Sequence, residues 1–201
     1  LLSVLLRAHD EDMARLGGYL ASTSSARHAS EEPVRQRLWH RLPWLLVGLL
    51  GSAVAAFIVR GFEAELAADV RLAFFLPGIV YMADAVGTQT EALVIRGMSV
   101  GVSLRRVVGS EVLTGVLVGL LLGVISFGGI LAATGQADLA ATVAISLLLA
   151  CAVATAVAMA LAAAMDHFNK DPAFGSGPLA TVIQDLLSLV LYFAVASALL
   201  T

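Results

Sequence analysis

Four acidic residues lie within otherwise apolar stretches of the sequence: Asp84, Glu91, Glu111 and Asp185. Placing a charged side chain at the centre of a bilayer costs on the order of 2.5–3.5 kcal/mol on insertion scales, so such residues usually face a protein interior or a water-filled path. No Lys or Arg lies well inside these stretches to neutralise the acids. Because anion pathways are lined by basic groups, the imbalance favours a path for cations.

Asp185 is the strongest candidate of the four. It lies in the apolar run Leu179–Leu200, which contains no Lys or Arg. A helix that begins at Pro178 would place Asp185 about 10 Å from its start. The alternative is an Asp that only organises helix packing. The polar residues that helical spacing places on one face, as in a pore lining, are Thr181, Asp185, Ser188 and Tyr192.

The available ligands indicate a hard cation. His167, beside the fourth apolar stretch, and Cys151, the only thiol, are too few donors for a Zn²⁺ or Cu⁺ site. Mg²⁺ gives up its waters reluctantly, so one carboxylate per chain would hold it hydrated, and a second chain would strengthen the site. Asp171 begins an Asp-Pro turn just before the Asp185 run and is a candidate second cation contact.

The composition is that of an integral membrane protein. Hydrophobic residues make up 59% and charged residues 13% of the 201 residues, and the mean hydropathy is +0.91. We expect an all-α membrane fold, with residues 1–41 as a cytoplasmic connecting helix and linker and residues 42–201 as a five-helix transmembrane domain. The predicted spans are about 42–59, 72–96, 107–131, 139–165 and 179–200, each close to the length that crosses a bilayer.

Basic residues predict the orientation of these spans. Arg35, Arg37 and Arg41 precede the first span, Arg96, Arg105 and Arg106 lie between the second and third, and Lys170 lies between the fourth and fifth. The opposite loops carry Arg60 and Arg71 among acidic residues, and Asp138. The positive-inside rule then gives a cytoplasmic N-terminus and an external C-terminus.

Three local patterns qualify this outline. Pro77-Gly78 and Gly87 in the second span allow either a proline kink or a partly unwound segment around residues 83–90. Gly115, Gly119 and Gly123 form a small-residue face for close helix contact, either within one chain or between two. Glu111 lies beside Arg105 and Arg106, which favours an ion pair at the membrane interface.

The chain resembles the transmembrane domain of the MgtE family of magnesium transporters and channels, from about His9 to Leu200. The matching residues are Glu11-Asp12, Leu16-Gly17, Trp44-Leu45, Gly61-Phe62-Glu63, Gly87-x-Gln89-Thr90, Leu93-Val94-Ile95-Arg96, Glu111, Asp171-Pro172-Ala173, Pro178-Leu179 and Asp185.

The resemblance implies a homodimer of five-helix domains in a cell inner (plasma) membrane, with one pore at the dimer interface. Asp185 of each chain would hold hydrated Mg²⁺, with Gly177 and Thr181 lining that site and Asp171 near the cytoplasmic end of the pore. Mg²⁺ would be the transported ion and also a regulatory ligand. Cytosolic CBS-type domains of a longer chain would sense it. Membrane lipid and a second copy are the expected partners, and nucleic acid is not.

The sequence also departs from the family pattern. Ala83-Asp84-Ala85 stands where many members have Gly-Gly-Asn, Gly177 replaces an Asn found in some members, and Ala162 lies where a Pro is often found. The added acid, Asp84, is therefore a candidate metal contact that would enlarge the cation site or shift its preference toward Mn²⁺ or Co²⁺.

The leading hypothesis is a channel-like pathway for Mg²⁺, not an enzyme, since none of the common nucleophile-base motifs occurs. One alternative is a proton- or sodium-coupled carrier for divalent cations such as Mn²⁺ or Co²⁺, in which Asp185 or Glu111 changes its protonation. The other is a membrane scaffold that transports nothing. Selectivity among Mg²⁺, Mn²⁺, Co²⁺ and Ca²⁺, and the choice between channel and carrier, are left open.

Overall fold

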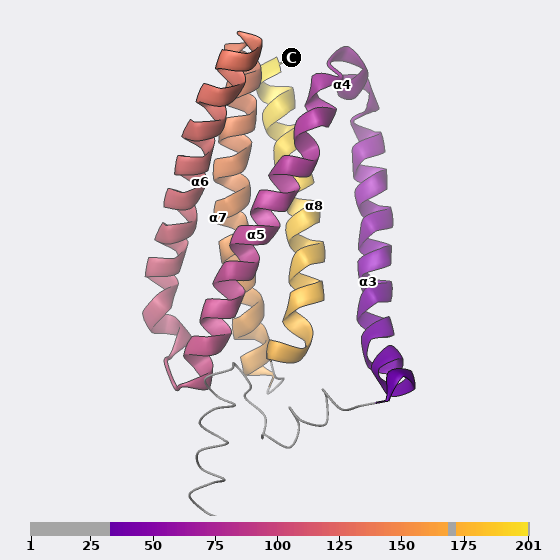
Figure 1. Ribbon diagram of the computed structural model, residues 1–201, viewed down its shortest axis with the longest axis vertical. Helices are drawn as coiled ribbons and strands as arrows, with labels where there is room; N and C mark the ends of the chain where they lie inside the picture. The colour runs from indigo at the N-terminus through magenta and orange to yellow at the C-terminus, as the bar shows by residue number, and fades with distance from the viewer. Residues whose placement is uncertain (1–32, 169–171, 201) are drawn as a thin grey trace, which may run out of the picture.

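The computed structural model describes residues 33–168 and 172–200, and within them it contains helices and connecting turns but no strand (Figure 1). Asp171, a predicted cation contact, and residues 1–32 of the predicted connecting helix and linker lie outside the described residues. The helices are α3 (Val34–Gly61), α4 (Glu63–Ala68), α5 (Arg71–Ser99), α6 (Leu104–Thr134), α7 (Ala137–His167) and α8 (Pro172–Leu200).

Five of these helices are long and apolar enough to cross a membrane: α3, α5, α6, α7 and the Gly177–Leu200 part of α8. Each contains one of the five spans that the sequence predicted, so the all-α membrane fold is confirmed. α3 runs through residues 41 and 42 without a break. The division into residues 1–41 and 42–201 stays a prediction.

The structure decides two local points that the sequence left open. α5 is one continuous helix across residues 83–90, so the partly unwound segment is absent. α8 begins at Pro172, and Pro178 lies inside it. Asp185 is therefore thirteen residues, or about 20 Å, from the start of its helix. Proline lacks an N–H donor but is tolerated within membrane helices, where neighbouring groups can satisfy the backbone.

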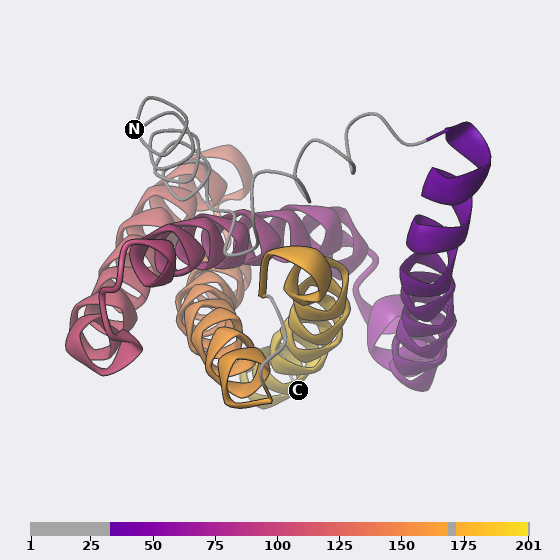
Figure 2. The same cartoon turned by 90° about the horizontal axis from the view of Figure 1, so that it is seen from below.

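α7 forms the centre of the bundle and packs against α5, α6 and α8, while α3 packs on α8 (Figures 1 and 2). Seen from below, α3 stands apart from the other four long helices (Figure 2). The apolar span of α3 contains no buried residue except Gly51, which contacts the side chain of Val182 on α8. Phe62, at the end of α3, stacks on Phe193 of α8 with ring centroids 4.3 Å apart.

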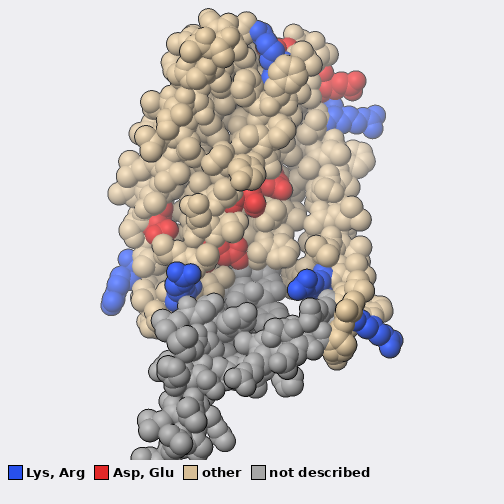
Figure 3. All heavy atoms as spheres, viewed as in Figure 1, with Lys and Arg blue, Asp and Glu red and all other residues tan. Residues whose placement is uncertain are grey.

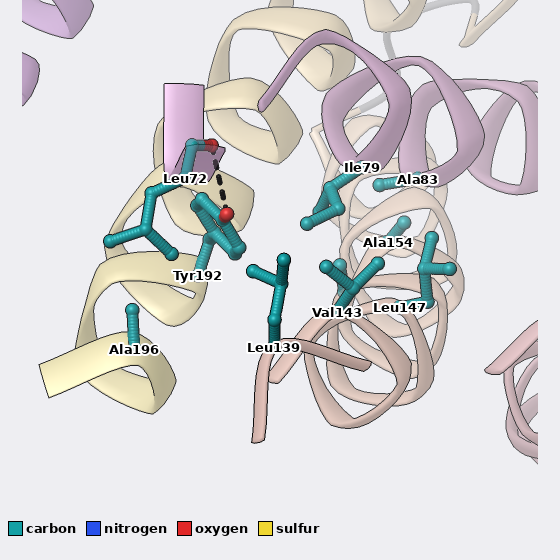
Figure 4. Close-up of a cluster of buried hydrophobic side chains, with 10 residues drawn as sticks. Leu72, Ile79, Ala83, Leu139, Val143, Leu147, Ala154, Tyr192 and Ala196 are labelled. Atoms are coloured by element: carbon teal, nitrogen blue, oxygen red, sulfur yellow. Dashed lines mark hydrogen bonds between the residues drawn. The ribbon is translucent and has the colours of Figure 1, made fainter. Parts of the chain in front are cut away.

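The main core lies between α5, α7 and α8 (Figure 4). Small residues of α7 such as Ala150 and Ala154 let the neighbouring helices approach closely. Tyr192 is fully buried, and its hydroxyl donates a hydrogen bond to the carbonyl oxygen of Leu72 at 2.8 Å. This bond satisfies the polar end of the tyrosine inside the bundle and joins α8 to the beginning of α5.

The glycine face of α6 packs within the chain, against α7. Gly115, Gly119 and Gly123 are all buried there. A methyl group added at Gly119 would lie 2.9 Å from the carbonyl oxygen of Leu148, and one at Gly123 would lie 2.8 Å from that of Ala144. The predicted close contact is thus confirmed, and it joins two helices of one chain.

Replacing Gly123 by Ala should lower the free energy of unfolding by about 1–3 kcal/mol, because the new methyl group would overlap a backbone oxygen that cannot turn away. Gly128→Ala is the matched control, since it changes the same helix where no atom lies within 4 Å. Unfolding in a detergent titration followed by circular dichroism would measure both. Equal stability of the two variants would contradict the close α6–α7 contact.

The turn before α5 is held by an acid–base pair. Asp69 accepts a hydrogen bond from the backbone N–H of Arg71 at 3.0 Å and forms a salt bridge with its guanidinium at 2.7 Å. Arg71 also donates to the side chain of Gln136, between α6 and α7, so this cluster connects two turns at one end of the bundle. Hydrogen bonding from the Arg71 guanidinium lowers the pKa of Asp69 below its ordinary value of 3.8.

A group whose pKa is lowered by folding adds stability above its unfolded pKa and loses that contribution as the pH falls through its folded pKa. Asp69→Asn should therefore destabilise the protein slightly at pH 7, by a few tenths of a kcal/mol for such an exposed pair. The difference from the wild type should shrink as the pH falls below 3.8. Paired unfolding titrations at pH 7, 4 and 3 would test this. A difference that is independent of pH would exclude the charge of Asp69 as its cause.

Candidate cation pathway

A groove between α3 and α8 holds the candidate site. Its volume is about 530 Å³ and its walls are mainly apolar, with Thr181 and Asp185 of α8 as two polar groups among them. The side facing them is formed by α3, including Trp44, Gly48 and Ser52, and Val80 of α5 completes the lining. Figure 3 shows acidic side chains at mid-height on one face of the molecule, between basic side chains near its two ends.

Three of the predicted metal contacts come together here. Thr181 donates a hydrogen bond to Asp84 of α5, with 3.0 Å between Thr181 Oγ1 and Asp84 Oδ1. Asp185 lies one helical turn beyond Thr181 on the same side of α8, so the Thr181 hydroxyl connects Asp84 to the helical face that carries Asp185. Asp84 does not line the groove itself but reaches it through Thr181.

Gly177 lies one turn before Thr181 on α8, so these two residues and Asp185 follow one another at intervals of four residues. Glu91 of α5 lies close by, with its Oε1 4.0 Å from where a side chain at Gly177 would begin. Glu91 is only 8% exposed. Glu91 is one of the four acids identified within the apolar stretches, but its place beside Gly177 was not predicted. The signal was available, because Glu91 and Asp84 are seven residues apart and so share one face of a helix.

Of the four residues predicted to form a polar stripe on α8, the last two do not face the groove. Ser188 is 2% exposed and Tyr192 is fully buried, so both face the bundle interior. The face of α8 toward the groove continues with Leu186 and Leu189. Real helices have 3.6 residues per turn and Ser188 lies seven residues beyond Thr181, so a small rotation of the helix decides which side of the stripe is exposed. Helix packing set that rotation here.

Gln184 is a buried polar residue that the sequence analysis missed. Its side chain amide donates to the carbonyl oxygen of Ala154 on α7 at 3.3 Å, and it is 1% exposed. Gly87 of α5 provides the space, because any side chain there would collide with Gln184. The Gly87-x-Gln89-Thr90 motif thus contains a glycine with a steric role beside the acid pair. The sequence did point to this residue, because Gln184 is a polar residue directly before Asp185 in an apolar run.

The ion pair predicted for Glu111 is absent. Within the described part of the chain, no salt bridge joins Glu111 to Arg105 or Arg106. Glu111 is half-buried on α6, the helix on the far side of α7 from α8.

The donor set suits an ion that keeps most of its water. Among the described residues, no three His, Cys, Asp or Glu side chains come together as they would in a dehydrated metal site. Two carboxylates and a hydroxyl from one chain can hold a divalent cation only if water supplies the remaining ligands or another chain adds its own.

Comparison with known proteins agrees with this chemistry. Residues 76–195 match the family model MgtE, described as a divalent cation transporter. The chain is 31% identical to the magnesium transporter MgtE of Bacillus subtilis, over 98% of this chain and 44% of the relative, and 31% identical to that of Thermus thermophilus, over 99% and 44%. Identity to the Enterococcus faecalis protein is 30%, over 84% and 38%. The chain thus spans less than half the length of these relatives.

The contact between Gly87 and Gln184 can be tested by a double-mutant cycle. Gly87→Ala should destabilise the protein by about 1–3 kcal/mol, because the new methyl group would push Gln184 away from the Ala154 carbonyl. In the background of Gln184→Ala the same change should cost much less. Gly78→Ala is the control, since no atom lies within 4 Å of the added group. Additive effects in a detergent unfolding titration would show that the two residues do not interact.

Proposed function

Because the chain belongs to the MgtE family of divalent cation transporters, we propose that it is the pore-forming part of a Mg²⁺ transport protein. The family consists of transporters, not enzymes, as the sequence analysis predicted. In this proposal hydrated Mg²⁺ passes along the groove of α8 and is stabilised there by Asp185, with Thr181, Gly177 and Asp84 as its neighbours. Asp171 is proposed as a further contact at the cytoplasmic end.

The observation that carries the proposal is the Asp84–Thr181–Asp185 cluster at membrane depth. It places acidic groups beside a groove that no Lys or Arg lines among the described residues. Two negative charges held together in a poorly polarisable environment are costly unless a cation joins them. A divalent cation neutralises the pair, and the membrane potential supplies about 4.6 kcal/mol per 100 mV to draw such an ion inward.

We further propose that two copies assemble with the groove faces toward each other. One copy offers only two carboxylates and a hydroxyl, and its groove is open on one side, so a second copy would complete the ion's surroundings and shield them from lipid. The exposed apolar side chains of α3, including Leu45 and Leu49, would then be divided between lipid and the partner. Trp44 lies at the edge of this surface and lines the groove.

The proposed location is a cell inner (plasma) membrane, with the end that carries Arg96, Arg105 and Arg106 in the cytoplasm. The opposite end carries only two basic residues, Arg60 and Arg71, fewer than the end assigned to the cytoplasm. The relatives are more than twice as long as this chain. We propose CBS-type cytosolic domains as partners that sense Mg²⁺ and act on the pore.

Transport would be tested with purified protein in liposomes at a fixed membrane potential, with an internal fluorescent Mg²⁺ indicator. Asp185→Asn should lower the rate of uptake at least about tenfold, since losing about 1.4 kcal/mol of stabilisation for the ion already changes a rate by that factor. Asn keeps the shape of the side chain and removes only its charge. Uptake should continue without any opposing proton or sodium gradient.

Glu111→Gln is the matched control, because it removes a membrane-embedded carboxylate from a helix that does not line the groove. Uptake at the wild-type rate in Glu111→Gln and loss in Asp185→Asn would support the proposed path. Equal uptake in the wild type and Asp185→Asn would remove Asp185 from the path. Uptake that requires a proton or sodium gradient would favour a coupled carrier, and no uptake by any variant would favour a scaffold.

A further inference from the structure

Thr181 bonds differently from other threonines in the described helices. Thr114, Thr134, Thr142 and Thr155 each donate their hydroxyl to the backbone carbonyl four residues earlier, which is the usual pattern for Thr in a helix. Thr181 instead donates to the Asp84 carboxylate on α5, at 3.0 Å. Its hydroxyl therefore connects two helices rather than its own turn.

This hydrogen bond holds Asp84 toward the helix that carries Asp185. Without a partner, the Asp84 side chain could turn away from the like charge of Asp185, since repulsion opposes their approach. The bond from Thr181 offsets part of that repulsion and holds Asp84 Oδ1 toward α8. A hydrogen bond to a charged group is also among the stronger side-chain contacts in a protein interior.

Resting on the transport function proposed above, we propose that Thr181 is a positioning residue that makes Asp84 a determinant of ion selectivity. The two carboxylates that it keeps together within one chain favour a divalent cation that gives up water more readily than Mg²⁺ does, represented by Mn²⁺. Asp185 attracts hydrated divalent cations in general. Asp84 then adds a second charged oxygen, which stabilises an ion that has lost part of its water shell.

The two ions differ in how readily they lose their water. Mg²⁺ dehydrates reluctantly and demands nearly ideal octahedral geometry, so an extra carboxylate at one side of the site stabilises it little. Mn²⁺ also prefers carboxylate and water oxygens but accepts direct carboxylate contact more readily. The absence of any three-acid cluster in the described part of the chain fits an ion that is only partly dehydrated.

The measured quantity is the ratio of Mn²⁺ uptake to Mg²⁺ uptake in the same preparation of proteoliposomes. Asp84→Asn and Thr181→Val, which nearly preserve side-chain shape, should each lower this ratio about tenfold, as is typical when a group that orients a metal contact is removed. Thr181→Ser keeps the hydroxyl and should retain most of the wild-type ratio. Thr114→Val removes a threonine hydroxyl from α6, away from the groove, and should leave the ratio unchanged.

The outcomes separate this inference from the function on which it rests. A wild type that transports both ions, with an unchanged ratio in Asp84→Asn and Thr181→Val, would overturn the selectivity role and leave the Mg²⁺ path in place. If Thr181→Ser also lowers the ratio of Mn²⁺ to Mg²⁺ uptake, the hydroxyl does not have the positioning role proposed for it. Absence of uptake of either ion by the wild type would instead refute the transport function.

A second measurement covers variants that insert poorly into liposomes. Mn²⁺ binding to purified protein in detergent, followed by electron paramagnetic resonance, should weaken about tenfold in Asp84→Asn and Thr181→Val. Competition by excess Mg²⁺ should be less effective against the wild type than against these variants. Equal Mn²⁺ affinity in all of them would contradict the proposal without any transport assay.

Discussion

The interior of a membrane offers no water to a polar group, so every such group in this bundle must find its partner in the protein. The described residues show how this requirement is met. Tyr192 bonds to the Leu72 carbonyl, Gln184 to the Ala154 carbonyl, and the buried threonines of α7 to their own helix. Asp84 accepts a hydrogen bond from Thr181, but among the described residues no Lys or Arg lines the groove to neutralise Asp185.

The same requirement explains why small residues dominate the interfaces. Apolar side chains gain little by leaving lipid for another apolar surface, so close backbone approach and internal hydrogen bonds must hold the helices together. α6 meets α7 through three glycines, and α5 meets α8 where Gly87 admits Gln184. These contacts place α5 and α8 close enough for Thr181 to reach Asp84. The acid pair therefore depends on residues that carry no charge.

Much of the fold could be predicted from the sequence. Span length and apolar content are properties of the chain alone, so the five long helices were found, and the spacing of Gly115, Gly119 and Gly123 identified a packing face. Helix rotation could not be predicted in this way. Ser188 and Tyr192 share a helical face with Asp185 on a helical wheel, yet packing against α5 and α7 turned both inward.

The candidate site, likewise, could be predicted from the sequence only in part. Asp185, Thr181 and Asp84 were identified from their residue types within apolar runs, and the structure brings them together. The pairing of Thr181 with Asp84 joins residues 97 positions apart and could not be read from local spacing. Pro178 and Gly177 suggested a helix start by ordinary turn rules, but within a membrane an early helix satisfies more backbone groups, and α8 begins at Pro172.

The anchoring of α8 near one end has a mechanical consequence. Tyr192 and Phe193 attach that region to α5 and to the end of α3. A tilt of the helix about this anchor would act as a lever. With a rise of 1.5 Å per residue, a tilt of about 10° would shift Asp185 by only about 2 Å but the beginning of α8 by about 5 Å. A small displacement at Asp185 would thus correspond to a larger one at the beginning of α8.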